Sequence, residues 1–221
     1  PYPKFSVSEL KKIAVVAVPS ILQQSFVSVG NMFIQGLINS YGSSVIAGYS
    51  AAIKLNTFSI TCFTTIGNSV SSFTAQNMGA GKTQRVKEGF KTGVLLALGV
   101  AAVAFILLFG FAGPCLDMFM NEGSTELARN TGIQFCRIVT PFYFLICLKV
   151  TSDGVLRGSG AMKAFMVSTF ADLLLRVVLA FVFAKFWGAV GIWLSWPVGW
   201  TLGTLLSVGF YKKGSWKRSM I

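Results

Sequence analysis

The sequence predicts an all-α, polytopic membrane protein with six transmembrane helices. Of its 221 residues, 53% are hydrophobic and only 12% are charged, about half the charged fraction of a typical soluble domain. Apolar runs of about 20 residues, the length that crosses a bilayer, recur along the chain, and short, mostly basic segments separate them. We expect transmembrane helices at about 13–39, 45–77, 92–111, 127–156, 162–186 and 190–210.

The first expected helix (13–39) follows a basic lead-in in which Ser8 and Glu9 form a weak cap. Pro19 removes a backbone donor near its start and predicts a kink. Four polar residues then share one helical face, namely Gln24, Ser28, Asn31 and Gln35. In lipid such a stripe must face protein or a water-filled cavity. It serves either interhelical hydrogen bonding or the lining of a cavity.

The second expected helix (45–77) is too long for a perpendicular span and is therefore tilted or protruding. Its polar face comprises Lys54, Thr61, Thr65, Asn68 and Ser72. Lys54 lies well inside the helix, where an ammonium group needs a partner or water. Two interpretations stay open for Lys54, a cavity or coupling role and a structural ion pair.

The stretch 75–89, AQNMGAGKTQRVKEG, is expected to form a basic cytoplasmic hairpin, because Lys and Arg resist translocation. The third helix (92–111) is almost wholly apolar, which is typical of a lipid-facing packing helix. Pro114 is expected to end it, and the acidic loop of Asp117, Glu122 and Glu126 is expected outside.

The fourth expected helix (127–156) is more polar than an inert span requires. Asp153 is four residues from both Lys149 and Arg157, so its carboxylate can neutralise either neighbour. Pro141 in mid-helix predicts a bend, a feature of substrate-handling helices.

The fifth expected helix (162–186) carries Asp172 and Arg176 one turn apart. This pair either fixes helix packing as a neutralised ion pair or handles a proton or cation. In the sixth helix (190–210), Trp193, Trp196 and Trp200 share a face, which we interpret as a lipid or packing surface rather than a cation-binding cage.

The basic residues predict the topology. Only Arg129 and Lys185 fall in segments expected outside, whereas thirteen cations fall in segments expected inside. The inside cations are Lys4, Lys11, Lys12, Lys82, Arg85, Lys87, Lys91, Arg157, Lys163, Lys212, Lys213, Lys217 and Arg218. Six spans with both ends of the segment in the cytoplasm satisfy this distribution.

Several functional classes are disfavoured by composition and motifs. The net charge of +12 would suggest nucleic-acid binding on a soluble face, but here it is dispersed among short loops. The chain has no His, and its four Cys lack the spacing of a metal site. The stretch GAGKT resembles part of a phosphate-binding loop, but Gln76 replaces the first glycine that this loop requires. We therefore expect neither an enzyme nor an ATP-driven pump, and no cofactor.

Two motifs point to a family. The stretch Gln76-Asn77-Met78-Gly79-Ala80-Gly81, closely followed by Arg85, resembles the loop after the second helix of a lobe in multidrug and toxic compound extrusion (MATE) transporters. The stretch 153–160, DGVLRGSG, resembles the Leu-Arg-Gly loop after the fourth helix of such a lobe. The resemblance implies a C-terminal six-helix lobe of a twelve-helix, pseudo-symmetric transporter.

The resemblance also implies a function and partners. Such transporters move organic cations or drugs outward and couple this to inward Na⁺ or H⁺. The expected partners are the lipid bilayer, a small organic cation and an N-terminal six-helix lobe, in the same gene product or in a separate chain. The expected location is the cell inner (cytoplasmic) membrane. The opening Pro-Tyr-Pro-Lys, without Met or a signal-peptide pattern, suggests a fragment or one half of a longer chain.

The candidate site residues follow from these patterns. We expect the substrate cavity to be lined by Gln24, Ser28, Asn31, Gln35, Lys54, Thr61, Asn68 and Lys149. The candidate ion-pair or coupling residues are Asp153, Asp172 and Arg176.

One departure from the family pattern concerns coupling. Some branches carry a Glu in the first helix of this lobe and an Asp near the middle of the fourth. The first helix here has Gln23, Gln24 and Ser28 in that region, and Asp153 lies close to the Arg-Gly turn. The resemblance therefore implies that this lobe shapes the cavity without binding the coupling ion.

Two alternatives remain. A flippase for lipids or lipid-linked oligosaccharides of the same superfamily would use buried cations for an anionic head group, a role that fits Lys54, Arg137, Lys149 and Arg176. A non-transporting membrane scaffold would use the polar stripes only for helix association.

Overall fold

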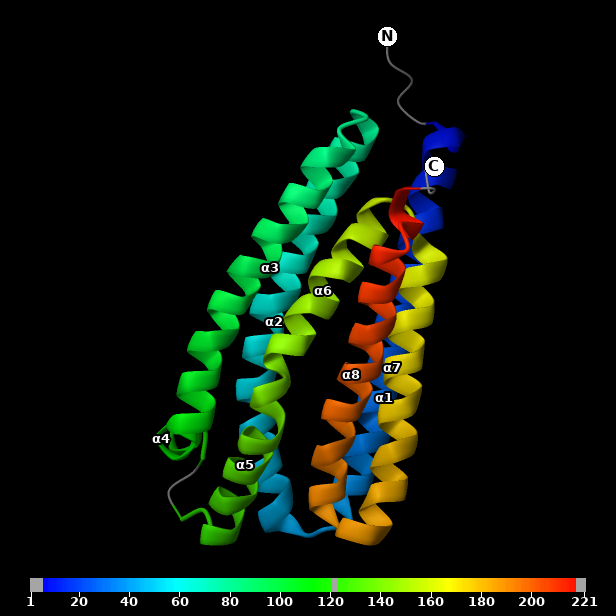
Figure 1. The fold of residues 1–221 in the computed structure, drawn as a ribbon. Helices are drawn as coiled ribbons and strands as arrows, with labels where there is room; N and C mark the ends of the chain where they lie inside the picture. The colour runs from blue at the N-terminus through cyan, green and yellow to red at the C-terminus, as the bar shows by residue number, and fades with distance from the viewer. Residues whose placement is uncertain (1–5, 121–122, 218–221) are drawn as a thin grey trace.

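The computed structural model describes residues 6–120 and 123–217, which form a bundle of long helices (Figure 1). The five uninterrupted long helices are α1 (Val7–Asn39), α2 (Ser43–Gly79), α3 (Thr83–Phe105), α7 (Met162–Trp187) and α8 (Ala189–Lys212). A sixth rod consists of α5 (Glu126–Val139) and α6 (Tyr143–Gly158). The short elements are a π-helical turn (Ile106–Gly110), α4 (Ala112–Asp117) and two 3₁₀ turns (Thr140–Phe142 and Ser215–Lys217). The protein is an all-α polytopic membrane protein, as the sequence predicts.

Two helices begin earlier than the sequence predicts. Helix α1 starts at Val7, and its N-cap is Ser6 rather than Ser8, since the Ser6 hydroxyl accepts a hydrogen bond from the backbone N–H of Glu9 at 3.4 Å. Helix α3 starts at Thr83, because the expected hairpin is only a short turn around Gly81, which has a φ of 69°. Hydropathy indicates where a helix enters the membrane, and helical structure continues beyond that point.

The three prolines noted in the sequence act differently. Pro114 lies inside the short helix α4, beyond the end of α3 at Phe105 and of the π-helical turn at Gly110. Pro141 lies in the 3₁₀ turn that separates α5 from α6, at the place where the sequence predicts a bend. Pro19 lies inside α1, which stays helical from Val7 to Asn39.

In the described part of the chain, five helical segments are long and apolar enough to cross a membrane. They are α1, α3 with the π-helical turn, the α5–α6 rod, α7 and α8. Helix α2 is the sixth long rod, with 37 residues, but Ser, Thr and Asn side chains lower its hydropathy. This polarity is the feature that the sequence assigns to a wet interior face.

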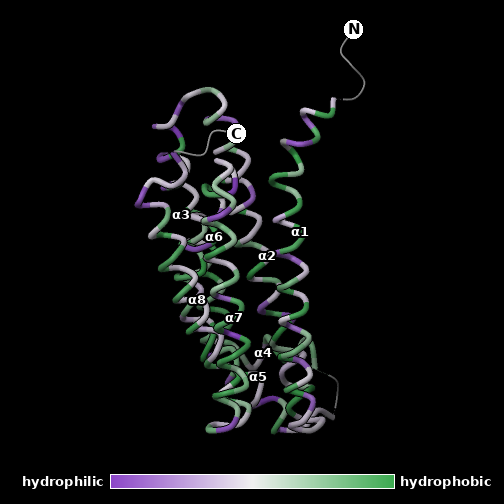
Figure 2. Tube along the Cα trace, turned by 90° about the vertical axis from the view of Figure 1, so that its right-hand side faces the viewer, coloured by the Kyte–Doolittle hydropathy of each residue, from purple (hydrophilic) through white to green (hydrophobic). Residues whose placement is uncertain are grey.

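The helices form two groups joined through α6 (Figure 1). Helix α2 packs on α3, α5 and α6, whereas α7 and α8 form a tightly packed hairpin. Helix α6 contacts both α2 and α8. Helix α1 packs mainly along α7, and its N-terminal part diverges from the other helices (Figure 2). This divergence leaves one side of α1 without close neighbours inside the chain.

The segments expected inside gather at one end of the bundle. The start of α1, the α2–α3 turn, the α6–α7 turn and the end of α8 all lie at the same end in Figure 1. Three charged residues of the predicted topology lie outside the described residues, namely the inside cations Lys4 and Arg218 and the outside acid Glu122. At the opposite end, the Arg129 guanidinium donates hydrogen bonds to Asp117 at 2.8 and 3.0 Å, which lowers the pKa of the Asp117 carboxyl.

Glycines allow α2 to approach the α5–α6 rod at backbone distance. A Cβ on Gly48 would lie 2.1 Å from the carbonyl oxygen of Ala128, and one on Gly154 would lie 2.4 Å from that of Gly67. A Cβ on Gly158 would lie 2.2 Å from the carbonyl oxygen of Ser71. Close contact through small residues is a general mode of helix association in membranes. The glycine of the Leu-Arg-Gly motif therefore has a packing role.

The close contact between α2 and α6 predicts that Gly→Ala substitutions at two different positions have opposite effects on stability. Gly154→Ala should destabilise the intact protein by about 1–3 kcal/mol, because the backbone of α2 has to move away. Gly99→Ala is the matched control, since a Cβ there meets nothing within 4 Å and alanine favours the helix by about 0.5–1 kcal/mol. Thermal unfolding in detergent would measure both. Equal effects of the two substitutions would contradict the packing account.

Candidate functional site

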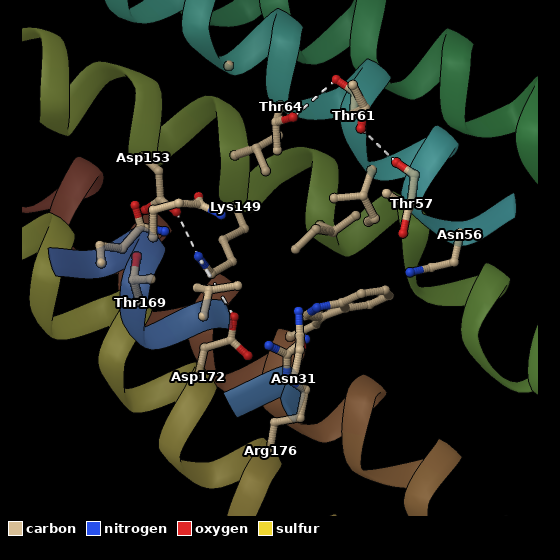
Figure 3. A pocket seen from close by; sticks show the side chains of 18 of the residues that line it. Asn31, Asn56, Thr57, Thr61, Thr64, Lys149, Asp153, Thr169, Asp172 and Arg176 are labelled. Atoms are coloured by element: carbon tan, nitrogen blue, oxygen red, sulfur yellow. Dashed lines mark hydrogen bonds and ion pairs between the residues drawn. The ribbon is translucent and has the colours of Figure 1, made fainter. Parts of the chain in front are cut away.

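Five helices enclose one polar cavity of about 590 Å³. Helices α1, α2, α6, α7 and α8 all contribute to its wall. Figure 3 shows the α2 wall facing the charged residues of α6 and α7, with Asn31 of α1 between them. The cavity thus lies between α1 and the helices from which it diverges.

Six of the eight residues expected around the cavity line it. They are Gln24, Asn31, Gln35, Thr61, Asn68 and Lys149. On α1 these positions correspond to the predicted polar stripe, and Gln23 joins them. The stripe is thus directed at the cavity for most of its length.

Ser28 and Lys54 do not line the cavity, and these two placements correct the prediction. Ser28 is exposed and donates its hydroxyl hydrogen to the Gln24 carbonyl at 3.1 Å. Lys54 is exposed on α2, on the same side as Phe58, whose exposed fraction is 74%. Its neighbours Ile53 and Thr57 line the cavity instead. A one-residue step of 100° around the helix separates the exposed face of Lys54 from the cavity face of Ile53 and Thr57. Lys54 also forms no ion pair in the part of the chain that the structure describes.

A buried lysine connects two carboxylates from different helices. Lys149 Nζ donates a hydrogen bond to Asp153 Oδ2 at 2.7 Å and lies 3.9 Å from Asp172 Oδ2. The exposed fractions of Lys149, Asp153 and Asp172 are 5%, 7% and 7%. The ammonium group therefore lies between α6 and α7 and faces a carboxylate on each of them (Figure 3).

Two hydroxyls complete the environment of Asp153. Ser207 Oγ on α8 donates to Asp153 Oδ1 at 2.6 Å, and Ser168 Oγ on α7 lies 3.3 Å from the same oxygen. Buried charges persist in apolar surroundings only when they are paired and hydrogen-bonded. Neither serine was expected from the sequence, since a hydroxyl in an apolar helix gives no periodic signal of its own.

An ion pair between Asp172 and Arg176 was one of two interpretations of their spacing, and no such pair occurs among the described residues. Asp172 faces Lys149, whereas the Arg176 guanidinium lies 4.6 Å from the ring centroid of Trp196. Trp196 and Trp200 line the cavity, and Trp193 is fully buried against Tyr49. The tryptophan face is therefore a packing surface toward the protein interior, and one of its rings holds a cation.

Two glycines of α8 provide the space for this cluster. A Cβ on Gly203 would lie 2.6 Å from Lys149 Cε and 2.9 Å from Asp172 Cβ. A Cβ on Gly199 would lie 2.8 Å from Asp172 Oδ1 and 2.9 Å from Arg176 Cβ. The Gly199–Gly203 spacing is visible in the sequence as a small-residue pair, but only the structure shows that charged side chains occupy the space.

Arg157 is a cavity residue, although its place in the sequence predicts only a cytoplasmic turn cation and a possible partner of Asp153. It lines the cavity, donates a hydrogen bond to Asn68 Oδ1 and lies 5.7 Å from the Phe165 ring centroid. Asp153 could have paired with either Lys149 or Arg157, and it pairs with Lys149. No group of three His, Cys, Asp or Glu residues suited to a metal occurs among the residues that the structure describes.

The fold and the cavity define a polytopic membrane protein with a polar cavity among its helices, and comparison with known proteins gives its family. The sequence profile of the MatE family matches residues 19–182. The chain belongs to this family of MATE transporters, whose members are transporters rather than enzymes.

Several relatives carry the name of multidrug resistance proteins or probable ones, and another is an FAD transporter of Shewanella oneidensis, 26% identical over 111 residues that cover 50% of this chain and 25% of that protein. The chain is 26% identical over 216 residues to the probable multidrug resistance protein YpnP of Bacillus subtilis, which covers 97% of this chain and 47% of that protein. It is 25% identical over 209 residues to the probable multidrug resistance protein YoeA of the same organism, and this alignment covers 93% of this chain and 44% of that protein. A solved structure of a MATE protein in complex with MaL6 has the same fold, with a TM-score of 0.88, 18% identity and coverage of 97% of this chain and 49% of that one. The chain thus spans about half the length of the proteins it matches.

The burial of Asp153 predicts how much its carboxylate contributes to the stability of the protein. Asp153→Asn should destabilise the intact protein by about 3–5 kcal/mol, because it leaves Lys149 buried without its nearest counter-charge. Asp117→Asn removes a similarly close pair whose side chains are 43% and 51% exposed, and it should change stability little. Thermal unfolding of the two variants in detergent would test this difference. A loss for Asp153→Asn as small as that for Asp117→Asn would show that the cluster is not buried as described.

Proposed function

We propose that this chain is one lobe of a secondary active exporter of small organic molecules, the organic cations or drugs that its family resemblance implies. Export would be coupled to inward movement of Na⁺ or H⁺. The observation that carries the proposal is a cavity of about 590 Å³ in a membrane bundle, lined by polar and charged side chains from five helices. Intramembrane charges around a cavity are expensive to bury and typically serve transport.

The lobe is proposed to work against a second one. Its partner would be an N-terminal six-helix lobe, in the same gene product or in a separate chain, and rocking of the two lobes would give alternating access to the substrate. The clustering of basic segments at one end supports an orientation with that end in the cytoplasm. The proposed location is the cell inner (cytoplasmic) membrane, surrounded by lipid.

The coupling ion is proposed to bind outside the cluster of this lobe. Lys149 already lies against Asp153 and Asp172, and an additional cation would have to compete with its tethered ammonium group. This agrees with the implication of the family pattern that this lobe shapes the cavity rather than binding the ion.

A flippase for an anionic lipid is the second candidate, and one observation favours it. Arg157 and Arg176 line the cavity, and neither forms an ion pair within the described residues. Of the cations that suggested this alternative from sequence, Lys149 and Arg176 reach the cavity, whereas Lys54 and Arg137 do not line it. The non-transporting scaffold is disfavoured because its polar stripes would have to face neighbouring helices rather than a cavity.

Ethidium efflux from cells that express the intact protein would test the exporter. Efflux should stop when one gradient, either Na⁺ or H⁺, is collapsed and should persist when only the other is collapsed. Lys54→Gln is a suitable control variant, because Lys54 lies outside the cavity and its loss should leave efflux unchanged. Efflux that is indifferent to both gradients, or absent, would contradict a cation-coupled drug exporter and favour the flippase.

A further inference from the structure

The charges around the cavity are unequally satisfied. Asp153 receives hydrogen bonds from Lys149, Ser168 and Ser207. Asp172 faces the same ammonium group through Oδ2, whereas its Oδ1 is buried beside Gly199 without a hydrogen-bond partner. Both oxygens of Asp153 are thus engaged by groups of the protein, and Asp172 has an ammonium group within reach of one of its oxygens.

Arg176 is the opposite case. Its exposed fraction is 7%, its Nε is buried without a hydrogen-bond partner, and no ion pair or hydrogen bond of its guanidinium occurs among the described residues. Its cation–π contact with Trp196, at 4.6 Å from the ring centroid, stabilises the buried guanidinium only modestly. An isolated buried charge costs considerably more than that. Asp172, one turn away on α7, already faces Lys149.

The surroundings of Arg176 are suited to an aromatic ligand. Tyr49, Trp196 and Trp200 line the same cavity, and Arg176 lies against the Trp196 ring, which fixes the plane of the guanidinium. A guanidinium presents its donors in a planar fork that matches carboxylate and phosphate oxygens. The amide side chain of Asn31 on α1 lies near Arg176 (Figure 3) and supplies a neutral donor and acceptor for the rest of the molecule, and Gln35 lines the same cavity.

We propose that Arg176 is a docking point for an anionic group of the cargo, so that this lobe prefers aromatic organic molecules that carry a carboxylate or phosphate over the same molecules without one. The inference rests on the proposed function, since it takes the cavity to be the place where cargo binds. It narrows the cargo to amphoteric or acidic aromatic compounds. A purely cationic molecule can still contact the neutral polar and aromatic side chains of the cavity, but it makes no favourable contact with the guanidinium.

Three xanthene dyes separate the charge states on one scaffold. Rhodamine 110 has a free carboxylate and a cationic ring system, rhodamine 123 is its methyl ester and is purely cationic, and fluorescein is an anion without the ring amines. Their binding to the purified intact protein, without any ion gradient, can be followed by fluorescence anisotropy. Rhodamine 110 should bind about tenfold more tightly than rhodamine 123, the size expected of one charge-assisted hydrogen-bonded contact. Fluorescein should also bind more tightly than rhodamine 123.

Variants assign the preference to one residue. Arg176→Gln should reduce rhodamine 110 binding to the level of rhodamine 123, while rhodamine 123 binding changes little. Lys54→Gln removes the same charge from the exposed side of α2 and should keep the preference. Arg176→Lys keeps the positive charge but loses the planar fork of donors, so it should keep part of the preference for rhodamine 110.

The outcomes distinguish this inference from the exporter proposal. Equal binding of the two rhodamines to the wild-type protein would overturn the docking point, whether or not the Arg176 variants fold. A preference that survives in a folded Arg176→Gln protein would do the same. A preference for rhodamine 110 without gradient-driven ethidium efflux would support the docking point and remove the exporter. Efflux without any preference would leave the exporter and remove the docking point.

Discussion

The structure depends on the burial of one ammonium group between two carboxylates. Lys149 lies between Asp153 on the same helix and Asp172 on α7, and all three residues are buried. Charges at this depth are tolerated only when each has a partner. The sequence of α8 meets this requirement with Gly203, which leaves room for the lysine stem, and Ser207, which donates to Asp153. The α6, α7 and α8 helices are therefore held in one relative position by electrostatics as well as by packing.

This arrangement separates the charges of the lobe by role. The two buried carboxylates face one lysine of the same lobe, so their charge is partly neutralised internally. Arg157 and Arg176 remain as the cavity cations without ion pairs among the described residues. An exporter built on this lobe would hold its coupling ion elsewhere and present arginines to its cargo. Polar side chains of α1 and α2 form much of the remaining cavity wall.

Much of the fold could be predicted because it follows from local patterns. Hydropathy located the six long rods, Pro141 marked the break between α5 and α6, and the spacing of Lys149 and Asp153 indicated their pairing. The failures concern choices made between helices. Asp172 has Arg176 one turn away in sequence, but its partner Lys149 comes from α6, and no periodicity encodes that choice. Lys54 was misplaced by one residue around α2, an angular step that composition cannot resolve.

A double-mutant cycle between Lys149 and Asp153 tests the internal neutralisation most directly. Thermal unfolding of the intact protein would be compared among the wild type, Lys149→Met, Asp153→Asn and the double variant. If the ammonium group neutralises this carboxylate, the double variant should be more stable than the sum of the single losses predicts, by roughly 1–3 kcal/mol. Losses that add to within about 0.5 kcal/mol would show that the two groups do not interact and would contradict the account.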